Sequence, residues 1–327
     1  MKICVVKLSA LGDIIHSMVV LQFIKKKYPD VVIDWVVEDS FKGILEDNPH
    51  INKIITVNLK SIKKNKLAFF SQIKLIRKYK KNNYDFVIDA QGLLKSAIVA
   101  KLITRKEIFG FSKNSIREGI ASFFYTKTSD IAYDKNVIDR NVKLFNDSMN
   151  MQITHKDVMN KQAFLYSKVN EIKKIDIIFV LGASKENKIY PKEKFVEVAN
   201  LLVDYDIEVI WANKYENEAA KYLFEHCDNV NICEKMSLDQ LKNKIIQASL
   251  VIGGDTGPTH MAWALNIASI TIFGNTPDYR NTYITDINKV IKSDTEVNAL
   301  RLDKNDFSIK NIDPKKISQL AYEILNR

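Results

Sequence analysis

The sequence predicts an α/β protein built from two doubly wound parallel sheets. Short β-branched runs alternate with helical patterns, and this alternation occurs twice along 327 residues, a length that suits two domains of about 150 residues each. Hydrophobic residues make up 46% of the chain and charged residues 27%, which is enough apolar material for two cores. We expect domains over residues 1–160 and 161–327, with the last helix a candidate for packing back on the first domain.

The first half opens with an apolar strand, and helical or turn segments separate the strands that follow. Strands are expected where β-branched and aromatic residues cluster, and helices where apolar residues recur at helical spacing. The expected strands cover residues 3–8, 31–38, 54–58, 84–91 and 107–111. The expected helices cover residues 13–27, the basic stretch 60–81, and 93–102.

The second half repeats this rhythm after a polar, partly helical segment over residues 139–174. Its expected strands are 175–183, 207–213, 230–233, 250–255 and 268–275, and its expected helices are 192–205, 216–226, 237–248 and 259–266. A closing helix over 313–326 has Asp313 as its cap and Pro314 at its first position. In such sheets ligands bind at the carboxyl ends of the strands, so the loops that follow strands are the places to search for chemistry.

The excess of positive over negative charge lies wholly in the first half. Residues 1–150 hold 26 basic and 15 acidic side chains, a net of +11, whereas residues 151–327 hold 23 and 24, a net of −1. The stretch 60–81 has nine basic residues and no acidic one, with an apolar stripe between them. This pattern is typical of a surface for anionic lipid or another polyanion, and equally of a solvated helix face. Nucleic acid ranks last, because no nucleic-acid-binding motif accompanies the charge.

Cysteine and histidine usage points to a reducing compartment and to no metal. Cys4, Cys227 and Cys233 form no CxxC pair, and the five histidines form no HExxH or other close ligand pair. The N-terminal apolar run is interrupted by Lys7, Asp13 and His16, so we expect neither a signal peptide nor a membrane span. A cytoplasmic protein whose membrane contact is peripheral is expected.

The first loop after a strand is SALGD at residues 9–13. It lacks both the GxGxxG dinucleotide fingerprint and the GxxxxGK[ST] phosphate loop, so neither NAD binding nor P-loop hydrolysis is supported. Gly12 permits a tight turn, and Asp13 falls at a helix N-terminus. Its carboxylate could cap the helix, which local sequence favours, or act as a general base at the end of a strand.

Two loops in the second half suit an anionic ligand. GGDTGPTH at 253–260 follows a buried strand and precedes a helix, so backbone N–H groups and the positive end of a helix dipole face whatever binds there. GASKENK at 182–188 offers a hydroxyl and two ammonium groups at another strand end. A capped tight turn is the alternative for each loop alone. Together the loops predict a diphosphate pocket.

Several of these segments match a known family together. The matching segments are distributed along essentially the whole chain: VVKLSALGDIIHS, YDFVIDAQGLLKSA, FGFSKNSIRE, IDRNVKLF, EKMSLDQL and GGDTGPTHMAWAL. In these segments the sequence resembles the lipopolysaccharide heptosyltransferases, and most closely their heptosyltransferase I members. The resemblance implies the GT-B fold: two Rossmann-like domains facing across a cleft, the first for the acceptor lipid and the second for the nucleotide sugar.

The implied reaction is transfer of L-glycero-D-manno-heptose from ADP-heptose to a Kdo residue of Kdo-lipid A, with inversion and without a metal or cofactor. Asp13 matches the family's catalytic base, and Lys188 matches the residue that stabilises departing ADP. The rival readings are a heptosyltransferase II acting on heptosylated core and a non-catalytic nucleotide-sugar-binding module. The enzyme is expected on the cytoplasmic face of the inner membrane, held peripherally by anionic lipid.

The resemblance also implies the binding residues. Ala183 stands where a threonine is usual and keeps only a backbone contact, while Lys185 and Pro258 replace a frequent arginine and leucine. The donor-binding positions are Ala183, Ser184, Lys188, Glu216, Met236, Asp255, Thr256, Gly257 and His260. The acceptor-binding candidates are Ser9, Gly12, Lys60, Lys64, Arg117 and Arg140.

Overall fold

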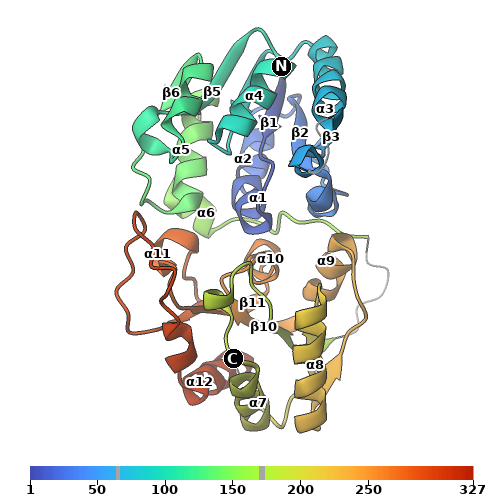
Figure 1. The fold of residues 1–327 in the computed structure, drawn as a ribbon, viewed down its shortest axis with the longest axis vertical. Coiled ribbons are helices and arrows are strands. Elements are labelled where there is room, and N and C mark those ends of the chain that lie inside the picture. The colour runs from blue at the N-terminus through green and yellow to red at the C-terminus, as the bar shows by residue number, and fades with distance from the viewer. Residues whose placement is uncertain (64–66, 169–173, 327) are drawn as a thin grey trace. The chain divides into compact units, whose positions relative to one another are not determined.

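A computed structural model describes residues 1–63, 67–168 and 174–326 of the chain. Lys64, one of the predicted acceptor residues, lies outside these described residues. The chain divides into two compact units, Met1–Phe164 and Leu165–Arg327, and each is an α/β domain around its own parallel sheet (Figure 1). The predicted fold class is therefore confirmed.

The first unit is a six-stranded parallel sheet in the order β3-β2-β1-β4-β5-β6. Val5 of the central strand lies opposite Trp35 on one side and Ile88 on the other. The strands are β1 (Lys2–Val6), β2 (Val32–Glu38), β3 (Lys53–Val57), β4 (Phe86–Asp89), β5 (Glu107–Phe111) and β6 (Lys127–Ser129).

Helices cover both faces of this sheet. As a result, consecutive residues of β1 from Ile3 to Val6, which point to alternate faces, are all fully buried. The α-helices are α1 (Leu11–Met18), α2 (Val20–Lys27), α3 (Leu67–Lys78), α4 (Leu94–Ile103), α5 (Val137–Met149) and α6 (His155–Met159). The 3-10 helices are η1 (Asp39–Ile44), η2 (Leu59–Lys63), η3 (Tyr79–Asn82), η4 (Lys113–Ser115) and η5 (Gly119–Phe124). On one face α3, α4 and η5 pack over Cys4 and Val6, whereas α1 and α2 pack against α5.

The second unit is also a six-stranded parallel sheet, in the order β12-β11-β10-β7-β8-β9. Its strands are β7 (Ile175–Val180), β8 (Ile207–Ile210), β9 (Val230–Ile232), β10 (Ala248–Gly254), β11 (Ala268–Phe273) and β12 (Asn288–Lys292). Its helices are η6 (Glu186–Lys188), α7 (Lys192–Leu201), α8 (Lys214–His226), α9 (Leu238–Ile246), α10 (Gly257–Leu265), α11 (Asp278–Asn281), η7 (Ser308–Asn311) and α12 (Pro314–Leu325).

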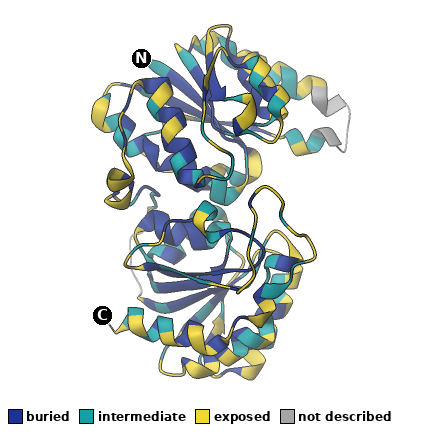
Figure 2. Cartoon of the chain, turned by 90° about the vertical axis from the view of Figure 1, so that its left-hand side faces the viewer, coloured by how far each residue is buried: buried dark blue, intermediate teal, exposed yellow. Residues whose placement is uncertain are grey.

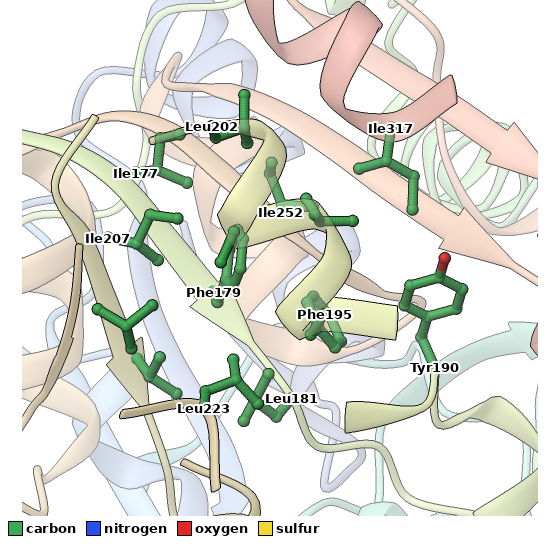
Figure 3. Close-up of a cluster of buried hydrophobic side chains, with 14 of the residues drawn as sticks. Ile177, Phe179, Leu181, Tyr190, Phe195, Leu202, Ile207, Leu223, Ile252 and Ile317 are labelled. Atoms are coloured by element: carbon green, nitrogen blue, oxygen red, sulfur yellow. The ribbon is translucent and has the colours of Figure 1, made fainter. Parts of the chain in front are cut away.

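The core of the second unit packs α7, α8 and α12 on one face of its sheet (Figure 3). Phe179 of β7 packs against Phe195 of α7 with ring centroids 5.1 Å apart, and the Tyr190 hydroxyl donates to the Ile312 carbonyl at 2.9 Å. The last helix, α12, contacts α7, β10 and β11 of its own unit through its buried Ile317 and Ala321. Its packing back on the first domain stays a prediction.

Several elements differ from the sequence predictions; α3, for example, begins at Leu67 within the helix expected over 60–81. The single helix expected over 13–27 is two helices, α1 and α2, which meet at Val19. The edge strands β6 and β12 were not expected.

Central strands are buried while the outer helix faces are exposed (Figure 2). Among the described residues, no helix has both the length and the apolar character needed to cross a membrane.

Candidate active site

The predicted donor residues of the second unit lie mostly in loops that leave the carboxyl ends of its strands. Strands β7 and β11 are both hydrogen-bonded to β10, so the ends of these three strands are neighbours. Lys188 follows β7, Asp255 follows β10, and a loop beginning at Gly274 follows β11. The topology of a parallel sheet therefore brings together residues that are far apart in the sequence.

Asp255 is the centre of this cluster. Its side chain is 6% exposed, and Lys188 Nζ lies 2.6 Å from its Oδ2 atom. His260 Nε2, from α10, lies 3.1 Å from Oδ1. Two more donors reach Oδ2 from beyond β11, namely Thr276 Oγ1 at 3.0 Å and Asn281 Nδ2 at 3.0 Å. One buried carboxylate is thus bonded by side chains from three segments, which follow β7, β10 and β11.

Two opposing effects set the pKa of Asp255. Burial favours the neutral acid and is the largest single effect, but the neighbouring Lys188 and His260 together outweigh it. The result is a pKa well below the usual range of an aspartate. Asp255 is therefore a carboxylate at neutral pH, and Lys188 is its principal counter-ion.

Glu216 closes a second part of the site at the junction of β8 and α8. Asn213 caps α8 and accepts from the Glu216 N–H at 3.0 Å, while Glu216 Oε2 accepts from the Ala212 N–H at 2.7 Å. Gly182, just after β7, allows this carboxylate to come close, since a Cβ atom there would lie 2.0 Å from Glu216 Oε1. The absence of a side chain at Gly182 thus permits contact between the two loops.

The remaining predicted donor residues also lie in segments that follow the carboxyl ends of strands in this sheet. Ser184 is exposed and Ala183 half-buried in the loop after β7. Thr256 is the N-cap of α10, and Gly257 is the first residue of that helix. Met236 is half-buried in the loop between β9 and α9.

The loop that carries Met236 is tied to the neighbouring strand. The indole Nε1 of Trp211, just after β8, donates to the Cys233 carbonyl at 2.7 Å. This bond joins the end of β8 to the start of the loop with Met236, and it was not foreseen from the sequence.

In the first unit, Asp13 lies in the first turn of α1. Its Oδ2 atom accepts from the Ala10 N–H at 3.3 Å, longer than the common value near 2.9–3.0 Å for such bonds. The capping geometry predicted from local sequence is thus present, though weak. Asp13 is half-buried, as are Ser9 and Gly12 beside it.

The loop that carries Asp13 is braced from β4. Gln91 Oε1 accepts from the N–H groups of both Leu8 and Ser9, at 3.0 and 3.1 Å. Asp89 in turn accepts from the Gln91 N–H at 2.9 Å and from the Tyr125 hydroxyl at 2.8 Å. Asp89 is fully buried, and this burial raises the pKa of its carboxyl. Neither Asp89 nor Gln91 was predicted from the sequence to support this loop.

The acceptor candidates have different surroundings. Lys60 lies over the Phe41 ring at 5.2 Å, and the exposed Arg117 lies over the Tyr133 ring at 5.1 Å. Arg140 is buried, and its guanidinium donates to the carbonyls of Ser115, at 2.6 Å, and Ala132, at 2.8 Å. These bonds make Arg140 a brace for the two loops around it, and its contact with an acceptor stays a prediction.

The structure thus brings together Lys188, Asp255 and His260, and it sets Glu216 beside the loop of Ser184. Sequence reasoning missed Thr276 and Asn281, although the rule that loops after strands carry chemistry pointed to the segment after β11. Over the part of the chain that the structure describes, no three His, Cys, Asp or Glu side chains converge as metal ligands do.

Comparison with solved structures gives the class of protein. An Escherichia coli heptosyltransferase WaaC with ADP-2-deoxy-2-fluoro heptose is 26% identical, covers 99% of both chains and has a TM-score of 0.82. The E. coli ADP-heptose LPS heptosyltransferase II matches in fold, with a TM-score of 0.75 at 18% identity, over 100% of this chain and 99% of that one. The fold and the site define a two-domain glycosyltransferase of the GT-B type.

The sequence comparisons give the family. The model of glycosyltransferase family 9 (heptosyltransferase) matches residues 72–308, so the chain belongs to this family. The lipopolysaccharide heptosyltransferase 1 of Campylobacter coli is 40% identical over 99% of both chains. That of E. coli K12 is 32% identical over 84% of this chain and 88% of its own. The resemblance to the heptosyltransferase I members is confirmed.

Proposed function

We propose that this protein transfers L-glycero-D-manno-heptose from ADP-heptose to a Kdo residue of Kdo-lipid A, in the synthesis of the lipopolysaccharide inner core. The observation that carries the proposal is the 40% identity to a lipopolysaccharide heptosyltransferase 1 along 99% of both chains. The cluster of Lys188 and Asp255 at neighbouring strand ends supports a donor site for an anionic nucleotide sugar.

On the donor side, Lys188 contacts the diphosphate together with Ser184 and the backbone of Ala183. Glu216 accepts the ribose hydroxyls, and Met236 lines the adenine slot. Asp255, Thr256, Gly257 and His260 bind the heptose. A relative of the same fold, solved with ADP-2-deoxy-2-fluoro heptose, supports this choice of donor. ADP-heptose is a substrate in this scheme, and the scheme uses no cofactor.

The chemical step is a single displacement. Asp13 takes the proton of the acceptor hydroxyl, whose oxygen forms a bond to the anomeric carbon of the heptose. The bond from that carbon to the diphosphate breaks, and its electron pair leaves with ADP, whose charge Lys188 stabilises. Attack from the face opposite the leaving group inverts the anomeric configuration.

On the acceptor side, Ser9, Gly12, Lys60, Lys64 and Arg117 are the proposed contacts to the phosphates and carboxylates of Kdo-lipid A, with Arg140 as a sixth candidate. The excess of positive charge lies in the first half of the chain, residues 1–150, which favours an anionic acceptor. A heptosylated core offers similar anionic groups, so transfer to that acceptor is the alternative function.

We also propose that the protein is cytoplasmic and attaches peripherally to the anionic inner-membrane surface through the outer side of α3, α4 and η5. Helix α3 packs against α4, and α4 packs against η5. These elements carry exposed apolar side chains, among them Phe70 on α3 and Ile98 on α4. On η5, Ile120 is 59% exposed and Phe123 is 77% exposed. Exposed basic residues lie on α3 and α4 and on η3, which directly follows α3: Lys74, Arg77, Lys78, Lys81, Lys95 and Lys101. Basic and bulky apolar side chains on one surface suit an anionic bilayer.

Co-sedimentation with vesicles tests the attachment. The wild type should bind phosphatidylglycerol-containing vesicles and not phosphatidylcholine vesicles, and added salt should weaken binding. Phe123→Ser should reduce binding, whereas Leu300→Ser, which alters a similarly exposed apolar residue of the second unit, should not. Equal binding to both vesicle types would rule out electrostatic attachment.

Mass spectrometry of the acceptor tests the reaction. The purified protein and ADP-heptose should add one heptose to Kdo-lipid A. A gain only on preheptosylated core would keep the donor and the mechanism but change the acceptor. No gain on either, with a folded protein that binds ADP, would make it a nucleotide-sugar-binding module.

A further inference from the structure

Asp255 has more hydrogen-bond donors than the proposed chemistry requires. A carboxylate offers about four lone-pair sites. In this structure Lys188, Thr276 and Asn281 all donate to Oδ2, and His260 lies against Oδ1. Thr276, in the loop after β11, and Asn281, in α11, belong to a segment that has no role in the proposed donor scheme.

These two neutral donors compete with Lys188 for the same oxygen atom. Each bond that Oδ2 accepts from Thr276 or Asn281 spreads its negative charge, so Asp255 holds the ammonium of Lys188 less tightly. Lys188 has three N–H donors and is 15% exposed at its side chain, so part of its charge remains for an incoming anion. Without the neutral donors, Asp255 would retain Lys188 more strongly.

We infer that Thr276 and Asn281 are positioning residues which act through Asp255 to keep Lys188 available to the diphosphate of the donor. This inference rests on the proposed function, because it assumes that a nucleoside diphosphate binds at Lys188. It assigns a role to the segment from Gly274 to Asn281, a loop and the short helix α11, which reaches Asp255 from the end of the neighbouring strand β11.

Calorimetric binding of ADP to the full-length protein tests this inference. Thr276→Val removes the hydroxyl at nearly constant volume and should weaken ADP binding several-fold, because Asp255 then holds Lys188 more tightly. Thr276→Ser keeps a hydroxyl and should restore most of the affinity. Asn281→Ala should weaken ADP binding to a similar extent. Thr285→Val is the matched control, because the Thr285 hydroxyl bonds Asn288 at 2.9 Å, away from Asp255, and its loss should leave ADP binding unchanged.

Two further measurements separate positioning from general damage to the loop. Adenosine lacks the diphosphate, so Thr276→Val should leave adenosine binding unchanged. In a Lys188→Met background, Thr276→Val should have no further effect on ADP binding, since the route through Lys188 is already lost. An unaltered ADP affinity in Thr276→Val, an equal loss for adenosine, or full additivity with Lys188→Met would each overturn the inference. Failure of the wild type itself to bind ADP would instead count against the proposed function.

Discussion

Asp13 illustrates how one side chain can satisfy both readings of a motif. Its carboxylate caps α1 through a long bond to the Ala10 N–H, and a weak cap leaves the carboxylate largely available to a second partner. The loop around it is fixed by Gln91 and not by Asp13 itself. A role as base is therefore compatible with its structural role.

Asp13→Asn keeps the shape of the side chain but removes the base. We expect the turnover number to fall by about 10²- to 10⁴-fold, since this is the usual contribution of a general base, while ADP binding stays at the wild-type level. Steady-state kinetics and calorimetry provide the two measurements. Asp30→Asn, at an exposed position of the same unit, should change neither. Wild-type turnover in Asp13→Asn would exclude Asp13 as the base.

The ion pair of Asp255 and Lys188 makes a prediction about acid stability. The pKa of Asp255 is lower in the folded protein than in the unfolded chain, so its stabilising effect is full above the unfolded value of about 3.9 and is lost as the pH falls below it. Asp255→Asn should cost about 3 kcal/mol of unfolding free energy at pH 7, because it leaves Lys188 unpaired and largely buried.

Urea unfolding at pH 7 and at pH 3 measures this dependence. The difference between wild type and Asp255→Asn should narrow as the pH falls below about 4. Asp228→Asn, at an exposed position, should follow the wild type throughout. A difference that is independent of pH would contradict the assigned pKa direction.

Lys188, Asp255 and His260 could be predicted from the sequence alone, because they lie in glycine-containing loops that follow predicted strands, and such loops can be recognised in a sequence. The sequence did not indicate Thr276 or Asn281, since a lone threonine and asparagine carry no pattern, and their importance arises only when β10 and β11 lie side by side. The burial of Arg140 could not be predicted from the sequence either, because arginine side chains are usually exposed.

At the level of elements, the junction of β7 and α8 depends on a close approach at Gly182. In Gly182→Ala the new methyl group would displace the Glu216 carboxylate, a movable group at the end of a flexible side chain. We expect ADP affinity to fall about tenfold, as for loss of a hydrogen bond to a charged group, with little change in thermal stability.

Gly110→Ala is the contrasting variant. A Cβ atom at Gly110 of β5 would lie 2.3 Å from the ring of Tyr125, which is buried and cannot move aside. This variant should lose about 1–3 kcal/mol of stability through overpacking and leave ADP binding unchanged. Thermal unfolding and calorimetry of both variants check the pair, and a stability loss in Gly182→Ala as large as in Gly110→Ala would contradict the reasoning.

The elements that sequence analysis missed share a physical cause. Strands β6 and β12 lie at sheet edges and have only one buried residue each, so their sequences need not be continuously apolar. β6 reads KTS and β12 reads NKVIK, and neither resembles the buried runs of the central strands. Central strands such as β1 and β10 were predictable because burial on both faces demands continuous apolar sequence.

At the scale of the whole molecule, the donor residues named above all belong to the unit Leu165–Arg327. This unit has its own sheet and its own hydrophobic core, so we expect a protein of residues 165–327 to bind ADP with nearly the affinity of the full chain. Calorimetry on the isolated unit, with circular dichroism as a control for folding, checks this. A folded unit without ADP affinity would mean that residues of the first unit contribute to donor binding.

The containment of the Asp255 cluster within one unit also bears on how such enzymes diversify. Lys188, Asp255, His260, Thr276 and Asn281 constrain one another within the unit Leu165–Arg327, whereas Asp13 and the residues that brace its loop belong to the unit Met1–Phe164. Substitutions that change acceptor preference can therefore accumulate in the first unit without disturbing the donor cluster. Descendants of one ancestral gene would keep a common sugar donor while their acceptors diverge.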